Sequence, residues 1–314
     1  MNSAEKINYE LRPCKCVERK MFLASLSRII GSIGQQYQYV GFGGLSFTDF
    51  VLFHKELNIE SMYSIEGGGY TKEKMQCNKP FSCINILNGM STDVLPSINL
   101  SDKPSIIWLD YDDALPYAPL FNDVTLIIPS IRVGSIIIIS CNRELKNKEN
   151  QPYSASEFRD IFGDIAPFKD VDDTTCKPGN APKTIRKMIE IHCNKLINDR
   201  NRNSKDHLKL YPLYNIVYEE HRGARMYTYG GIFLDDKTDV QTLNIEDFDF
   251  INTENPYEII VPKITHRESL LLNQVLGDEK KERGLIEKGI INTKQLEQYK
   301  KIYKYMPNFY DVRL

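Results

Sequence analysis

Apolar and polar residues follow a pattern that changes repeatedly between strand and helix over the first two thirds of the chain. Short apolar runs rich in β-branched and aromatic residues predict strands, and apolar residues three or four positions apart predict amphipathic helices between them. The predicted strands are residues 37–40, 62–65, 81–87, 105–109, 135–141, 211–220 and 224–234. Strands that alternate with helices are typical of a parallel, doubly wound α/β sheet.

Two of these predictions define the type of sheet. Residues 135–141 contain four consecutive isoleucines, which is typical of a central parallel strand buried on both faces. The last two strands are joined by His221-Arg222-Gly223 and predict an antiparallel hairpin. We therefore expect a mostly parallel, Rossmann-like sheet of seven strands that ends in this hairpin.

The same pattern divides the chain into parts. The predicted parts are an N-terminal segment with a covering helix (1–36), a sheet domain (37–234), an acidic and irregular connector (235–263) and a small helical appendage (264–314). In the appendage, Thr265 and Glu268 have the spacing of a capping box. Residues 284–291 predict a break before the last helix, which is rich in tyrosine. Such a helix is more typical of core packing than of an interface, although these helices could also bind a partner protein.

Residues 37–66 predict a strand, a glycine turn, a helix and a second strand that ends on a carboxylate. Gly41 and Gly43 lie in the turn, and Glu66 follows the second strand. Glycines allow a ligand to approach the backbone, and an acid at this spacing can accept hydrogen bonds from ribose hydroxyls. The pattern therefore favours a ligand that contains a nucleoside. The alternative is an ordinary tight turn between a buried strand and a helix.

Polar residues also follow the third and fourth predicted strands. Asn88 and Gly89 end one, and Asp110 and Asp112 follow the other. Right-handed crossovers place the carboxyl ends of parallel strands at one edge, where ligands bind. We therefore expect these residues to converge with Glu66. For Asp112 the alternative is a solvated loop or a helix cap.

Composition and charge exclude several classes of function. The 314 residues carry a net charge of −2, so no global basic field attracts nucleic acid or membrane. The seven scattered cysteines, the polar first residues and the absence of a long apolar run predict a cytoplasmic protein with reduced thiols and no membrane segment. No phosphate-binding loop or hydrolase elbow occurs, and no cysteine or histidine spacing predicts a metal site. A basic face on the helix over 183–202 is more typical of a solvated surface than of a nucleic-acid contact.

The order of these motifs resembles class I S-adenosylmethionine-dependent methyltransferases over roughly residues 17–234. The segments RPCKCVERK, YVGFGGLSFTDFVLFHKEL, SIE and WLDYD are similar to a group of bacterial proteins described as O-methyltransferases, some of them encoded near phage-defence genes. The resemblance implies S-adenosylmethionine as cofactor. By the same resemblance, the cofactor-binding residues are Gly41, Phe42, Gly43, Glu66, Asn88, Gly89 and Asp110.

The chain departs from the family pattern at two positions of the glycine turn. Tyr39 stands where the family carries an acid, and Leu45 stands where it carries a third glycine. These departures leave open a methyltransferase fold that binds the cofactor poorly.

The expected activity is methyl transfer to an oxygen of an unidentified acceptor. Asp110 and Asp112 are the candidate catalytic residues, because a base would remove the proton of the acceptor. The signature for methylation of DNA amino groups is absent. One alternative is a non-catalytic subunit that binds a protein or nucleic acid, in a bacterial phage-defence system. Another is a nicotinamide-dependent oxidoreductase, which the antiparallel hairpin argues against.

Overall fold

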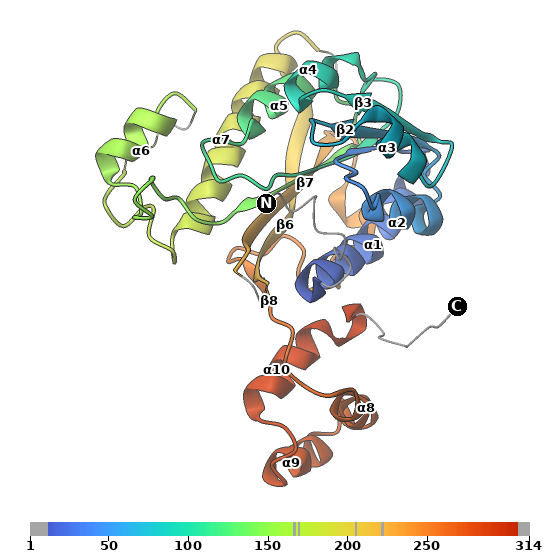
Figure 1. Ribbon diagram of the computed structural model, residues 1–314, viewed down its shortest axis with the longest axis vertical. Coiled ribbons are helices and arrows are strands. Elements are labelled where there is room, and N and C mark those ends of the chain that lie inside the picture. The colour runs from blue at the N-terminus through green and yellow to red at the C-terminus, as the bar shows by residue number, and fades with distance from the viewer. Residues whose placement is uncertain (1–11, 166–167, 169, 205, 221–222, 307–314) are drawn as a thin grey trace.

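The central feature of the molecule is one twisted sheet with helices on both faces (Figure 1). The computed structural model describes residues 12–165, 168, 170–204, 206–220 and 223–306. Within those residues the sheet has eight strands in the order β3-β2-β1-β4-β5-β7-β6-β8. The strands are β1 (Gln38–Gly41), β2 (Ser61–Glu66), β3 (Ile84–Asn88), β4 (Ser105–Asp110), β5 (Ile136–Asn142), β6 (Leu208–Glu219), β7 (Arg225–Asp235) and β8 (Tyr257–Ile259).

Strand direction confirms the expected doubly wound sheet with an antiparallel hairpin. β1 pairs in parallel with β2 and β4, and the parallel pairing continues to β3 on one side and to β5 on the other. β7 is antiparallel to β5 and to β6. Residues 221 and 222 of the predicted turn lie outside the described residues. The carboxyl ends of the first five strands therefore share one edge.

The helices form two layers because strand residues alternate between the faces. The helices are α1 (Pro13–Ile33), α2 (Thr48–Leu57), α3 (Lys72–Asn78), α4 (Ser91–Val94), α5 (Leu120–Ile127), α6 (Ala155–Phe162), α7 (Ala181–Asn201), α8 (His266–Val275), α9 (Glu279–Glu287) and α10 (Thr293–Ile302). On one face, Tyr39 and Trp108 share a core with α1 and α2. On the other, Val40 and Ile107 share a core with α5 and α7, and Figure 1 shows the two helix pairs on opposite sides of the sheet.

The sheet has one strand more than the sequence pattern predicted. The segment 235–263 was expected to be irregular, but Tyr257–Ile259 pairs in parallel with β6. Tyr257 and Ile259 are buried and Glu258 between them is exposed. Three residues are too short to show the alternation that predicts a strand. Its pairing partner is about forty residues away and can be identified only in the folded chain.

The C-terminal helices project from the sheet as a separate small group (Figure 1). The expected capping box at Thr265 and Glu268 is present at the start of α8. The break predicted over 284–291 is wrong in its first part, because Gly284 lies inside α9. Asp278 caps this helix through the backbone N–H of Lys281, which offsets the low helix propensity of glycine. Residues 307–314 of the predicted appendage lie outside the described residues.

In the part of the chain that the structure describes, no helix combines the length and the apolar character needed to cross a lipid bilayer.

Candidate functional site

The carboxyl edge of the sheet brings the expected residues together. Gly41 of β1 lies in register with Ser64 of β2 and with Trp108 of β4. Glu66, the last residue of β2, lies beside Asn88, the last residue of β3. Asp110 ends β4 in the same edge and is paired in register with Ser140 of β5. The polar ends of β2, β3 and β4 therefore lie at one edge of the sheet, with Gly41 of β1 between Glu66 and Asp110.

Glu66 is held by the glycine turn that follows β1. Its Oε1 accepts hydrogen bonds from the backbone N–H of Gly43 at 3.2 Å and from the Ser64 hydroxyl at 2.6 Å. A Cβ on residue 43 would lie 2.3 Å from the Ser64 Oγ and 2.8 Å from Glu66 Oε1. Glycine is thus required for the carboxylate to reach the turn. The fixed orientation suits an acid that must meet a ligand in one pose.

Burial raises the pKa of Glu66, although the hydrogen bonds from Ser64, Gly43 and Gly44 act to lower it. Burial disfavours the charged form of a carboxyl group, and donated hydrogen bonds favour it. Here burial has the larger effect. A ligand hydroxyl or cation that paired with Glu66 would therefore stabilise its charged form, which has lost contact with water through burial.

The structure gives Gly41 a role in packing. A Cβ at this position would lie 2.4 Å from the Tyr39 hydroxyl and 3.1 Å from the Trp108 carbonyl oxygen. Tyr39 is 1 % exposed and packs against Phe50 and Phe53 of α2. Position 39 is thus a core tyrosine whose ring occupies the space beside Gly41.

The segment after β3 contains an exposed side chain that sequence reasoning missed. Met90 follows Asn88 and Gly89 and is 52 % exposed. Its Sδ lies 3.2 Å from where a Cβ on Gly67 would be, so it borders the turn after Glu66. The Gly89 N–H donates to the Glu66 carbonyl at 3.0 Å. An exposed thioether at a strand end offers an apolar contact to a planar ligand, but no sequence signal separated Met90 from other methionines.

Asp110 forms an ion pair with Lys15 of α1. Lys15 Nζ donates to Asp110 Oδ1 at 3.0 Å, and the Asp110 side chain is 15 % exposed. Burial alone would raise the pKa of Asp110, but the charges of Lys15, Arg12 and Arg19 prevail and lower it. Asp110 is therefore an ionised carboxylate at neutral pH.

Lys15 was missed as a site residue, since the segment RPCKCVERK that contains it entered the sequence analysis only as part of the family resemblance. A signal was present in the helix spacing. Lys15 and Glu18 lie seven and four positions before Phe22, so they extend the buried stripe that continues through Ser25. Charged residues that fall on the buried face of an amphipathic helix indicate that they are buried and paired with opposite charges.

Asp112 lies in a different environment from Asp110. It is exposed, whereas the Tyr111 side chain between them is buried and its hydroxyl donates to Asp123 Oδ2 at 2.6 Å. Among the described residues, no group of three or more histidine, cysteine or acidic side chains has an arrangement that could hold a metal ion. The residues that could bind a ligand at this edge are thus Glu66, Asn88, Met90 and Asp110.

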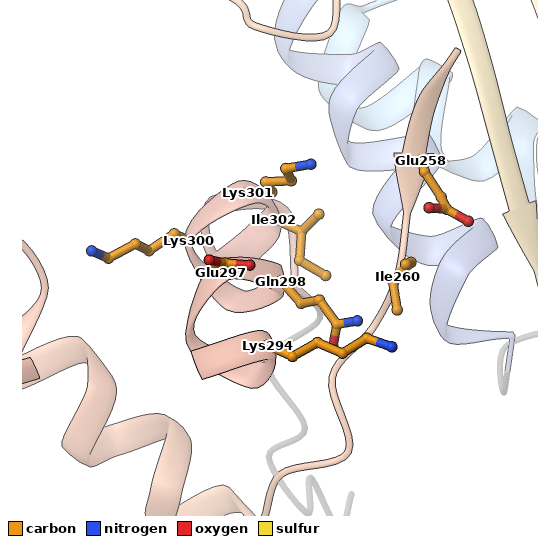
Figure 2. A pocket seen from close by; sticks show the side chains of 8 residues that line it. All are labelled: Glu258, Ile260, Lys294, Glu297, Gln298, Lys300, Lys301 and Ile302. Atoms are coloured by element: carbon orange, nitrogen blue, oxygen red, sulfur yellow. The ribbon is translucent and has the colours of Figure 1, made fainter. Parts of the chain in front are cut away.

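A hollow lies where the appendage meets the sheet, lined by residues far in sequence from those of the carboxyl edge. Figure 2 shows it between β8 and α10, with the Ile302, Gln298 and Lys294 side chains turned toward the strand. Its volume is about 420 Å³, and Glu258 and Ile260 line the strand side. None of the expected site residues lines this hollow, so it is separate from the carboxyl edge.

Several solved methyltransferases have weakly similar folds. Trm1 from Pyrococcus horikoshii, solved with S-adenosyl-L-methionine, is 9 % identical over 74 % of this chain and 57 % of its own, with a TM-score of 0.45. This chain thus spans little more than half of that protein. Cofactor-bound Rv0187 from MTB is 13 % identical over 68 % of this chain and 79 % of its own, with a TM-score of 0.36. Precorrin-6y C5,15-methyltransferase from Geobacter metallireducens GS-15 is 8 % identical over 65 % of this chain and 84 % of its own, with a TM-score of 0.32.

The sequence itself identifies the family. No curated protein matches the chain. A family model does match, over residues 7–314, and its description is "Putative O-methyltransferase". The match includes the glycine turn, Glu66, Asp110 and the C-terminal helices, so nearly the whole chain is covered. The chain therefore belongs to this O-methyltransferase family.

Proposed function

We propose that this protein uses S-adenosylmethionine to methylate an oxygen atom of its acceptor. The observation that carries the proposal is Glu66 at the carboxyl end of β2, bonded to the glycine turn and adjacent to Asn88 in register. A carboxylate in this place can accept hydrogen bonds from both ribose hydroxyls. Membership of the O-methyltransferase family supports the same reaction.

The residues at the edge fit this cofactor. The Gly43 N–H and the Ser64 hydroxyl both donate to Glu66 Oε1, and we expect Oε2 to face the ribose. Asn88 and the exposed Met90 would contact the adenine, one by hydrogen bonds and the other by its apolar face. At Gly44, φ is +55° and a Cβ would have no heavy atom within 4 Å. The turn therefore has open space beside Gly44, where the amino-acid moiety of the cofactor would approach its backbone.

Asp110 would act on the acceptor. The bound cofactor supplies a sulfonium methyl group, which is reactive enough that alignment is the main task of the protein. An ionised Asp110 can accept a hydrogen bond from the acceptor hydroxyl, hold its oxygen in line and receive its proton. Its lowered pKa makes it a weaker base than an ordinary aspartate and favours the orienting role. Asp112 is exposed and would assist from the loop.

Calorimetry with S-adenosylmethionine and its demethylated product tests the proposal directly. We expect both to bind. Labelled donor mixed with cell extracts then identifies the acceptor, and Asp110→Asn should lower kcat by about 10²–10⁴-fold while donor affinity changes little. Asp113→Asn, an exposed neighbour in the same loop, is the matched control and should keep full activity.

Two outcomes would contradict the proposal. Failure of the folded wild-type protein to bind either compound would remove the cofactor assignment. Tight binding without transfer to any extract would instead support a non-catalytic subunit.

A further inference from the structure

Charged side chains on the first two turns of α1 are buried against the sheet. Lys15 and Glu18 have no exposed surface and Arg19 is 3 % exposed. Charged residues are rarely buried to this degree unless opposite charges pair with them. Arg19 forms an ion pair with Asp49 of α2. Lys15 has two carboxylate partners, one on its own helix and one at the end of β4.

The Lys15 ammonium joins α1 to the candidate site. Its Nζ hydrogen-bonds Asp110 Oδ1 at 3.0 Å. It also lies 3.0 Å from Glu18 Oε2, an ion pair without good hydrogen-bond geometry. The Trp108 ring covers a third side, with its centre 4.4 Å from Nζ. These contacts leave the ammonium little freedom, so the carboxylate bonded to it is restrained too.

Glu18 is fixed from behind by a directional chain of hydrogen bonds. Trp108 Nε1 donates to Ser140 Oγ at 3.0 Å, Ser140 Oγ lies 2.9 Å from Thr228 Oγ1, and Thr228 Oγ1 donates to Glu18 Oε1 at 2.5 Å. The indole N–H can only donate, so the Ser140 hydroxyl donates to Thr228 and the Thr228 hydroxyl donates to Glu18. The chain of hydrogen bonds therefore ends on the Glu18 carboxylate. Asp110, Ser140 and Thr228 are neighbours in register on β4, β5 and β7.

We propose that Lys15 is a positioning residue, which fixes the orientation and the negative charge of Asp110 through the Trp108–Ser140–Thr228–Glu18 network behind it. The first turns of α1 are then part of the site rather than a cover for the sheet. The catalytic consequence rests on the proposed function, because Asp110 contacts the acceptor only in that mechanism. The effect of Lys15 on the charge of Asp110 does not depend on it.

The charges around Asp110 set the direction of the expected change. The charged and titratable groups near it are Arg12, Lys15, Glu18 and Arg19 of the α1 region, Cys141 of β5, Glu220 after β6, and Asp112 in its own loop. The Asp110 charge is felt by Cys141, whose pKa burial and this carboxylate raise to about 12. Burial raises the pKa of Asp110 and the Lys15 charge is the largest influence that lowers it, so removing that charge should raise the pKa.

Carbon-13 NMR of aspartate carboxyl groups in the full-length protein measures this directly. Asp110→Asn identifies the Asp110 signal. In the wild-type protein we expect this carboxyl to titrate below the ordinary aspartate range. In Lys15→Met the titration midpoint should rise by at least about one pH unit, a tenfold change in the ionisation constant. Lys15→Arg keeps the positive charge and should keep the midpoint low.

The control is Lys20→Met on the same helix, because the Lys20 ammonium donates to the Met306 carbonyl oxygen at 3.0 Å rather than to Asp110. It should leave the Asp110 midpoint unchanged. An ordinary midpoint in the wild-type protein, or an unchanged one in Lys15→Met, would overturn the proposal. If Lys15→Met does not fold, the titrations of the wild-type protein and Lys15→Arg test the proposal, and an ordinary Asp110 midpoint in either would overturn it. None of these readouts needs the donor, so a failure of cofactor binding would be recognised separately.

Discussion

Two carboxylates at the same sheet edge have opposite electrostatic environments. Burial raises the pKa of Glu66, whose hydrogen-bond donors are neutral. Asp110 is also buried, but Lys15 and two arginines lower its pKa. A ligand that donates hydrogen bonds would thus stabilise the charged form of Glu66, whereas Asp110 is ionised without a ligand. Pairs of acids with diverging pKa values are typical of sites in which the two perform different tasks.

The Glu66→Gln variant should separate ligand binding from stability. The amide oxygen can still accept from Gly43 and Ser64, but a charge-assisted bond to the ribose is lost, so donor binding should weaken by about 1–3 kcal/mol. Because the folded-state pKa is raised, the stabilising contribution of Glu66 is full below its unfolded pKa and is lost as pH rises through the folded value. At pH 7 the variant should therefore be as stable as the wild-type protein or more so.

Calorimetry and urea unfolding of Glu66→Gln at pH 7 and pH 4 measure both effects. Unchanged affinity would remove Glu66 from the binding site. A large loss of stability at pH 7 would show that its bonds to the turn matter more than its burial.

At the scale of elements, the β1–α2 turn shows why glycines occur where they do. The missing side chain of Gly43 makes room for Ser64 and Glu66, and that of Gly41 makes room for Tyr39. Both glycines therefore serve contacts within the chain, whatever ligand binds outside them. The turn builds the site by letting the acid of β2 approach the end of β1.

Gly41→Ala should reduce the stability of the fold. The added methyl group would overlap the Tyr39 hydroxyl and approach the β4 backbone, and overpacking of a core costs about 1–3 kcal/mol. Gly31→Ala is the matched control, since a Cβ in that part of α1 meets nothing within 4 Å and replacing helical glycine stabilises by about 0.5–1 kcal/mol. Urea unfolding compares the two. Wild-type stability in Gly41→Ala would mean that Tyr39 moves aside at little cost.

At the scale of the whole molecule, the appendage has its own small core and is attached to the sheet domain through the end of α10 and the residues that follow it. Leu272, Ile291, Leu296 and Tyr299 pack together, whereas Ile302 at the end of α10 belongs to the core that α1 and α2 share with the sheet. The Tyr257 hydroxyl of β8 adds a hydrogen bond to the Lys301 carbonyl at 3.0 Å. Binding of a partner protein through the C-terminal helices remains a prediction.

Ile302→Ala should destabilise the protein by about 2–5 kcal/mol, because Ile302 is 1 % exposed and its truncation leaves a cavity. Tyr303→Ala, next to it and 37 % exposed, should have a much smaller effect. Urea unfolding gives both values, and hydrogen exchange should show α8 and α9 opening before the central strands. Equal effects of the two substitutions would contradict this attachment.

A cytoplasmic location, a phage-defence setting and the domain boundaries remain predictions.

The sequence by itself determined the parts of the molecule that depend on local pattern. Isoleucine-rich runs specify the buried central strand, and the carboxylates that end β2 and β4 follow directly from strand periodicity. Parallel strand order then places Glu66, Asn88 and Asp110 at one edge. Tertiary structure alone decided which groups surround them. Helix spacing can indicate that Lys15 is buried and paired, but its partner Asp110 lies 95 residues away, and β8 joins a strand about forty residues away. The identity of such partners depends on packing geometry.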